Sequence, residues 1–259
     1  MPITVVDRAA EPHCGGLQWS IADVDTLATL AALVLVGRAQ HAARVLGGAL
    51  VLPVPTPAAM RAQIQSELLP VAGAPIYHRD GLLFEIICWL VARQRALPSE
   101  VISEPHTKAT QQGVDTIKVR FDEASRQVIK ATIYEYKCTT NARAQFRDHV
   151  IPAFRRYFDG ARDPQLVQPM IALLDRYELT DLEQANVYGA LVNDRPFVFQ
   201  AALTVEPESF PEGLCVALFE DYANVTSVRE DRFGDTLPLQ DVRAWFADLA
   251  SRIWDKINV

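Results

Sequence analysis

The stretch KATIYEYKCTT at residues 130–140 decides the fold and carries the most distinctive chemical groups of the chain. Its β-branched and aromatic side chains recur with the period of two that is typical of a strand. The alternation predicts one face that runs from apolar residues into a charged pair and a second, aromatic face: Ile129, Ala131, Ile133, Glu135 and Lys137 on the first, Tyr134 and Tyr136 on the second. A carboxylate and an ammonium group are therefore expected side by side at the end of this strand.

A second strand is expected just upstream, in GVDTIKVRF at residues 113–121. The sequence DEASRQ separates the two runs and favours a turn, so they are predicted to form an antiparallel hairpin. Such a hairpin sets Asp115 near the Glu135 end of its partner. The two carboxylates and Lys137 thus become one candidate site.

The rest of the chain alternates between helical and extended patterns. Ser20 is a candidate cap for one long helix that Gly47-Gly48 ends, Thr56 is a candidate cap for the next helix, and Asn141 is one for the helix after the hairpin. The expected helices are 21–46, 57–69, 78–97, 142–158, 164–177, 181–191 and 239–257, and the further expected strands are 3–6, 49–54, 100–104, 195–205 and 214–220. This order predicts an α/β (α+β) fold with a mixed sheet flanked by helices. A mainly helical supporting segment, 1–75, is expected to precede a core, 76–259.

Composition narrows the class of protein. The chain has 259 residues, of which 49% are hydrophobic, so a sizeable buried core is expected. A formal charge of −7 argues against binding nucleic acid through a broad basic surface, and any such contact is expected to be local or supplied by a partner. The four cysteines lack metal-site spacing, and no apolar run approaches the length of a membrane span, which favours a soluble, cytoplasmic protein.

Glu85 and the pair Arg143 and Arg147 each have a structural and a functional interpretation. Glu85 lies among Leu82, Leu83, Phe84, Ile86 and Ile87 in the helix expected at 78–97. It is either a boundary residue that faces solvent or a carboxylate that points toward a metal site. Arg143 and Arg147 are one helical turn apart and form either a solvated basic face or a clamp for a substrate backbone.

The order of these residues resembles the PD-(D/E)XK nuclease superfamily. The resemblance covers roughly residues 78–205 and lies in GVD at 113–115, EYK at 135–137 and the helix acid Glu85, although Val114 stands where the family motif has proline. It implies a restriction-endonuclease-like core that cleaves nucleic acid, DNA rather than RNA as the first expectation. Asp115 and Glu135 would hold Mg²⁺ or Mn²⁺ with the Tyr136 carbonyl and Glu85, and Lys137 would orient the attacking water.

A narrower resemblance is to the nuclease subunits of Hachiman-type anti-phage defence systems. It lies in the size of the chain, the order of the elements and the late position of the Glu-x-Lys motif. It implies an antiviral effector that a helicase partner holds and controls. The acidic balance of the chain agrees with delivery to DNA by such a partner.

Matches to other catalytic motifs are weaker. One alternative function is non-enzymatic. His78-Arg79-Asp80 and Phe233-Gly234-Asp235 partly match kinase motifs, but Glu85 stands where a kinase has asparagine and no glycine-rich phosphate loop precedes them. The serious alternative is a catalytically inactive nuclease-like adaptor in a protein complex. In that case Glu135 and Lys137 form a strand-end ion pair of little energetic weight.

Overall fold

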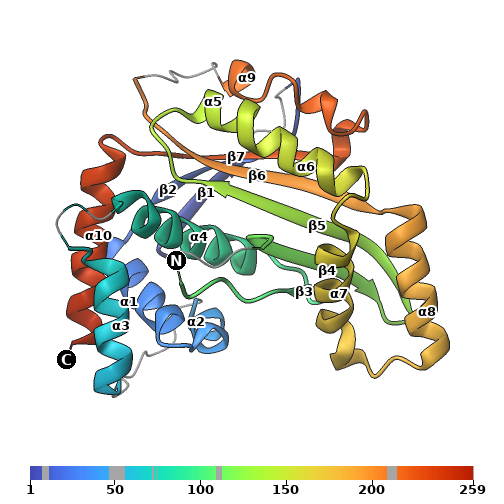
Figure 1. Ribbon diagram of the computed structural model, residues 1–259, viewed down its shortest axis with the longest axis horizontal. Coiled ribbons are helices and arrows are strands. Elements are labelled where there is room, and N and C mark those ends of the chain that lie inside the picture. Colours follow the sequence, from blue (N-terminus) through green and yellow to red (C-terminus); the bar gives the residue numbers. More distant parts are fainter. Residues whose placement is uncertain are drawn as a thin grey trace.

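The computed structural model describes residues 1–7, 12–46, 56–71, 73, 75–108, 113–208 and 215–258 (Figure 1). Within these ranges the strands form one seven-stranded sheet in the order β1-β2-β7-β6-β5-β4-β3. The strands are β1 (Ile3–Asp7), β2 (Leu17–Ile21), β3 (Glu100–Ile102), β4 (Thr116–Asp122), β5 (Gln127–Lys137), β6 (Phe197–Val205) and β7 (Arg232–Pro238). The pairs β1–β2, β3–β4 and β4–β5 are antiparallel, and β5–β6, β6–β7 and β2–β7 are parallel. The predicted mixed sheet is therefore confirmed.

Helices cover both faces of this sheet. One layer packs on the tyrosine face of β5 and contains α1 (Val24–Leu35), α2 (Ala39–Val45), α3 (Ala58–Leu68), α4 (Ile76–Gln94) and α10 (Val242–Ile257). The opposite layer contains α5 (Ala142–Gln145), the π-helical turn η1 (Phe146–Val150), α6 (Ile151–Phe158), α7 (Asp163–Leu174) and α8 (Asp181–Gly189). Figure 1 shows α4 and α6 on opposite sides of β5. Two hydrophobic cores thus enclose the sheet, one beneath each helical layer.

The β4–β5 hairpin confirms the central prediction. Thr116 pairs with Tyr134 and Ile117 with Ile133, so the start of β4 lies beside the end of β5. The expected alternation fails at one position, because the register shifts between Arg120 and Phe121 and leaves Ile129 bulged and 45% exposed. Val128 takes its place on the apolar face. A bulge of one residue moves the preceding side chains of the strand to the opposite face of the sheet. A strict period of two does not predict this change.

Helix α4 is the central helix of its layer. Every side chain from Leu82 to Ala92 is buried, because this helix lies between the sheet and both α1 and α10. Phe84 meets Phe246 of α10 edge to face, with ring centroids 6.4 Å apart. The predicted apolar stripe of α10 is confirmed, since Phe246 and its stripe neighbours are all buried: Val242, Leu249 and Ile253. This packing fixes the position of α4 relative to β5.

The N-terminal segment differs from the expected single long helix. Ser20 lies in β2, where its hydroxyl group contacts the Thr4 hydroxyl across the strand pair. Asp23 caps α1 instead, accepting a hydrogen bond from the Thr26 N–H at 3.0 Å. Gly37 then adopts a φ of +77° and separates α1 from α2, because glycine enters the left-handed region without steric cost. The helix end expected at Gly47-Gly48 and the strand expected at 49–54 lie outside the described residues.

Other expectations also need correction. The predicted strand at 214–220 is a short helix, α9 (Cys215–Leu218). Strand β7 was not predicted, because its sequence RFGDTLP contains three residue types that are depleted in strands. Gly234 in β7 is required by packing, since a Cβ there would lie 2.5 Å from the Phe219 ring. Pro57, not Thr56, is the N-cap residue of α3, without a side-chain cap.

Strands β1 and β2 from the N-terminal segment belong to the same sheet as the strands of the expected core. The division into 1–75 and 76–259 stays a prediction. Among the described helices, none combines the length and the apolar character needed to cross a bilayer.

Candidate metal centre

Four segments of the chain meet at the C-terminal end of β5: α4, the loop after β3, the start of β4 and β5 itself. Together with Gln145 of α5 and Arg243 of α10, they line a cavity of about 450 Å³. Its acidic, basic and histidine lining residues are His78, Glu85, His106, Lys108, Asp115, Lys137 and Arg243, with Tyr136, Cys138, Thr139 and Gln145 among the others. The cavity therefore brings Glu85, Asp115 and Lys137, which sequence analysis placed in one site, into a single space.

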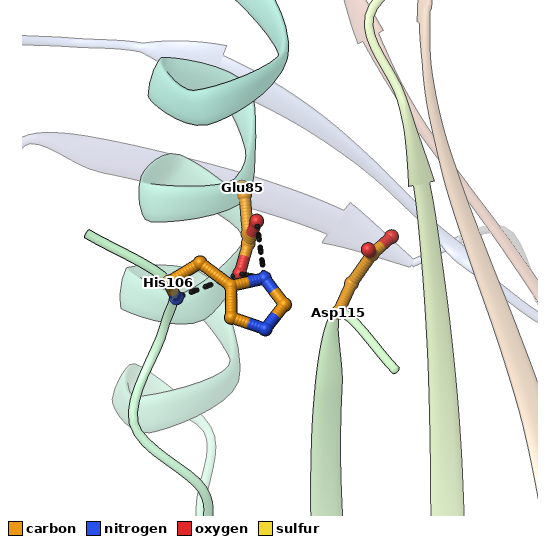
Figure 2. Close-up of side chains that lie close together, drawn as sticks. All are labelled: Glu85, His106 and Asp115. Carbon is orange, nitrogen blue, oxygen red and sulfur yellow. Dashed lines mark hydrogen bonds and ion pairs between the residues drawn. The ribbon is translucent and has the colours of Figure 1, made fainter. Parts of the chain in front are cut away.

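Glu85, His106 and Asp115 form a compact group in this cavity (Figure 2). Each offers one ligand atom, and these three atoms lie within 4.8 Å of one another. The His106 N–H donates to Glu85 Oε1 at 2.9 Å, and His106 Nδ1 lies 3.1 Å from the same oxygen. A carboxylate, an imidazole and a second carboxylate at this spacing are suitable ligands for a divalent ion.

Glu85 is buried, so it is not the solvent-facing boundary residue that sequence analysis allowed for. Its contact with His106 accounts for a carboxylate among apolar neighbours. The pKa of His106 is raised, mainly by its side-chain hydrogen bond with Glu85, because this bond stabilises the charged imidazolium.

Asp115 is half-buried and lies just before β4. Its Oδ2 accepts a hydrogen bond from the Tyr136 N–H at 2.6 Å, which ties the start of β4 to the Glu-x-Lys segment. Burial, followed by the negative charge of Glu135, raises the pKa of Asp115 above the ordinary carboxyl range. Glu85 acts in the same direction. Three carboxylates thus gather where a cation would relieve their repulsion.

Glu135 and Lys137 project from the same face of β5, as predicted, and Lys137 Nζ contacts Glu135 Oε1 at 2.5 Å. Burial lowers the pKa of Lys137, but the charges of Glu135 and Asp115 outweigh it and the net shift is upward. Lys137 lines the cavity, whereas Glu135 stands outside the three-residue ligand group. Ligation of one ion by Asp115, Glu135 and the Tyr136 carbonyl stays a prediction.

His106 is the residue that sequence analysis missed. It is 21 positions from Glu85 in the chain, and the two meet because the loop after β3 returns across α4. The only signal in the sequence was a lone histidine in the segment EPHTK, after a short strand. A single histidine in a loop carries no spacing information.

Arg143 and Arg147 lie outside this cavity. Asn141 caps α5 as predicted, but the π-helical turn η1 begins at Phe146 and interrupts the regular helical period between the two arginines. Arg143 donates to Asp221 Oδ2 at 2.6 Å, whereas Arg147 pairs with its neighbour Asp148. Contact of either arginine with a substrate stays a prediction.

The segment His78-Arg79-Asp80 has a structural role at the cavity wall. Asp80 is fully buried and pairs with Arg79 at 2.7 Å and with Arg243 of α10 at 2.5 Å. This cluster joins α4 to α10. Two residues of the kinase-like triplet, Arg79 and Asp80, thus belong to a buried ion cluster with Arg243.

Comparison with known proteins identifies no relative of this chain, so the site is interpreted from its geometry. No protein-family model matches the chain, and neither a curated protein nor a solved structure matches it. The arrangement has carboxylates for a divalent ion, a fixed ammonium group beside them and an open cavity of sufficient size for part of a substrate. Such groups are suited to hydrolysis at a negatively charged centre.

Proposed function

We propose that this chain is a divalent-metal-dependent endonuclease that hydrolyses phosphodiester bonds in DNA. The observation that carries the proposal is that Glu85, Asp115 and Lys137 line one cavity. Glu135 forms an ion pair with Lys137. These residues come from a helix and two adjacent strands. The resemblance to PD-(D/E)XK nucleases implies this same set of positions.

The connectivity around the site also supports the proposal. Helix α4 precedes the antiparallel strands β3, β4 and β5, and the helices α5 to α8 lead to β6, which is parallel to β5. Asp115 thus immediately precedes the strand next to Glu135 and Lys137. A restriction-endonuclease-like core has a mixed sheet with its acidic residues on adjacent strands in this manner.

The residues present fit a hard divalent ion such as Mg²⁺ or Mn²⁺, because carboxylate oxygens are its preferred ligands. When bound, such an ion supplies a nucleophilic water at neutral pH and neutralises charge on the phosphate. The side chains of Asp115, Glu135 and Glu85, with the Tyr136 carbonyl, would hold it. Lys137 would donate to the attacking water or a phosphoryl oxygen, since an ammonium group has three donors and Glu135 takes one.

The surroundings of the site bear on its partners. Lys108 and Arg243 line the cavity and could contact substrate phosphates, while Arg143 and Arg147 would contact the backbone farther away. With a formal charge of −7, the chain is expected to reach DNA through a partner such as a helicase. We therefore infer a cytoplasmic effector of an anti-phage defence complex, controlled by that partner.

A cleavage assay with single- and double-stranded DNA and RNA tests the proposal, in Mg²⁺ or Mn²⁺ and in EDTA. Glu135→Ala and Lys137→Ala are expected to lower the rate at least about 1,000-fold, because each removes charge from the reacting centre. Lys130→Ala is the matched control, since Lys130 lies on the same strand and pairs with Asp231 at 3.3 Å. This control should cleave at the wild-type rate.

Two results would count against this proposal in different ways. Cleavage that survives both substitutions would remove Glu135 and Lys137 from the active site. Absence of cleavage in every condition, including with a helicase partner present, would favour the adaptor. The Glu135–Lys137 contact would then be a structural ion pair.

A further inference from the structure

His106 lies where two hollows of the surface meet. It lines the site cavity, and it also lines a groove of about 860 Å³ that Arg162, Gln165 and Gln168 border. Its imidazole is thus accessible from the cavity that holds Asp115 and from the groove along α7. An ion could reach this side chain without rearrangement of the core.

The position of the imidazole is fixed by Glu85. The backbone N–H of His106 donates to Glu85 Oε1 at 2.9 Å, and Nδ1 lies 3.1 Å from Oε1 and 3.3 Å from Oε2. The exposed fractions of the two side chains are 14% and 11%. A side chain restrained in this way loses little further freedom when it binds an ion.

We propose that His106 is a nitrogen ligand of the metal centre, together with Glu85 and Asp115, and that this nitrogen makes the centre select Mn²⁺ over Mg²⁺. The inference rests on the proposed metal-dependent function and identifies its ion. Two opposite metal bonds of about 2.2 Å separate their ligand atoms by about 4.4 Å. The three ligand atoms lie within 4.8 Å, so shifts of a few tenths of an ångström bring them around one ion.

The selectivity follows from the donor atoms. Mg²⁺ is a hard ion that binds oxygen and keeps several waters, and imidazole adds little to its affinity. Imidazole suits first-row transition ions, and Mn²⁺ is the member of that series that also shares the preference of Mg²⁺ for carboxylates. The ligands expected from the sequence are all oxygens and would not separate the two ions. His106 is the group that does.

Binding of the ions alone, without nucleic acid, tests this inference. Mn²⁺ titrated into the wild-type chain should give saturable binding by electron paramagnetic resonance, with nitrogen modulation of the spin echo from a bound imidazole. His106→Gln should abolish this modulation and weaken Mn²⁺ about 10- to 100-fold, while the Kd for Mg²⁺ changes less than about 3-fold. His78→Gln is the matched control, because His78 lines the same cavity outside the ligand group.

His106→Asp is a second variant, with an oxygen ligand in place of nitrogen. It should bind Mn²⁺ and Mg²⁺ with more similar affinities. The inference is overturned if wild type binds no Mn²⁺, if it shows no nitrogen modulation, or if His106→Gln weakens both ions equally. Nitrogen-coordinated Mn²⁺ without cleavage would refute the proposed function but not the ligand assignment.

Discussion

Asp115 and Asp235 are two aspartates withdrawn from solvent beside the same sheet, and their surroundings differ. Asp235 in β7 is 1% exposed and accepts hydrogen bonds from the Leu17 N–H at 2.9 Å and from Gln200 Nε2 at 2.7 Å. The net pKa of Asp235 is about 7, because burial raises it more than these hydrogen bonds and then Arg95 and Lys118 lower it. Asp115 instead has Glu135 and Glu85 near it, which raise its pKa further, while Lys137 lowers it only in part.

The hollows beside the two aspartates also differ in volume. The hollow beside Asp235 has a volume of about 50 Å³, whereas Asp115 lines the cavity of about 450 Å³. Burial alone therefore does not identify a functional carboxylate, since both aspartates are desolvated. Like charges gathered around an open cavity do indicate a site for a cation, because Lys137 offsets only part of their repulsion and the pKa of Asp115 stays raised.

The largest expected difference between the two aspartates is in catalysis. Asp115→Asn should lower the cleavage rate at least about 1,000-fold, because the variant loses a charged ligand. Asp235→Asn should stay within about 3-fold of wild type, since an asparagine oxygen can still accept from the Leu17 N–H. Rates on the same DNA substrate measure both. Equal loss in the two variants would remove the distinction.

A third aspartate, Asp80, is buried like the other two, but Arg79 and Arg243 neutralise its charge. Asp80→Ala should lower the free energy of unfolding by about 3 to 5 kcal/mol, because Arg79 remains buried without its partner. Urea denaturation measures this change. Asp248→Ala is the control, because Asp248 forms an exposed pair with Arg252 that should contribute less than about 1 kcal/mol.

The difference in pH dependence between wild type and Asp235→Asn reports on Asp235, because Asp115, whose pKa is also raised, is common to both proteins. Well below about pH 4 this residue is protonated in both the folded and the unfolded chain, so it adds no penalty. As the pH rises toward 7, the unfolded chain releases the proton while the folded chain retains it. The free energy of unfolding should therefore fall over this range, by on the order of 3 kcal/mol, and level off above it. Denaturation of wild type and Asp235→Asn at pH 5 and pH 8 measures this, and parallel profiles would contradict it.

The smallest expected effect is stabilisation by the ion. Mn²⁺ at 100 times its Kd should raise the free energy of unfolding of wild type by about 2.7 kcal/mol, since it binds the folded chain. Asp235→Asn should respond equally, while Asp115→Asn should respond little. Thermal unfolding with and without Mn²⁺ shows the difference. A full response of Asp115→Asn would place the ion elsewhere.

Much of the site could be predicted because its parts are local in the chain. Glu135 and Lys137 share a face through the period of a strand, and the short turn of the hairpin brings Asp115 beside them. The bulge at Ile129 could not be predicted, because it depends on how β4 and β5 pair. Strand β7 was missed because its pairing with β2 and β6 overrides its weak strand propensity.

The sequence by itself determined the charged face of β5, the hairpin and the apolar stripe of α10, because each follows from a short repeat along the chain. Only the tertiary structure decided that His106 joins Glu85 and that Arg243 neutralises Asp80. Those pairs are 21 and 163 positions apart. Distances between packed elements depend on how whole helices lie against the sheet, and spacing along the chain contains no record of that packing.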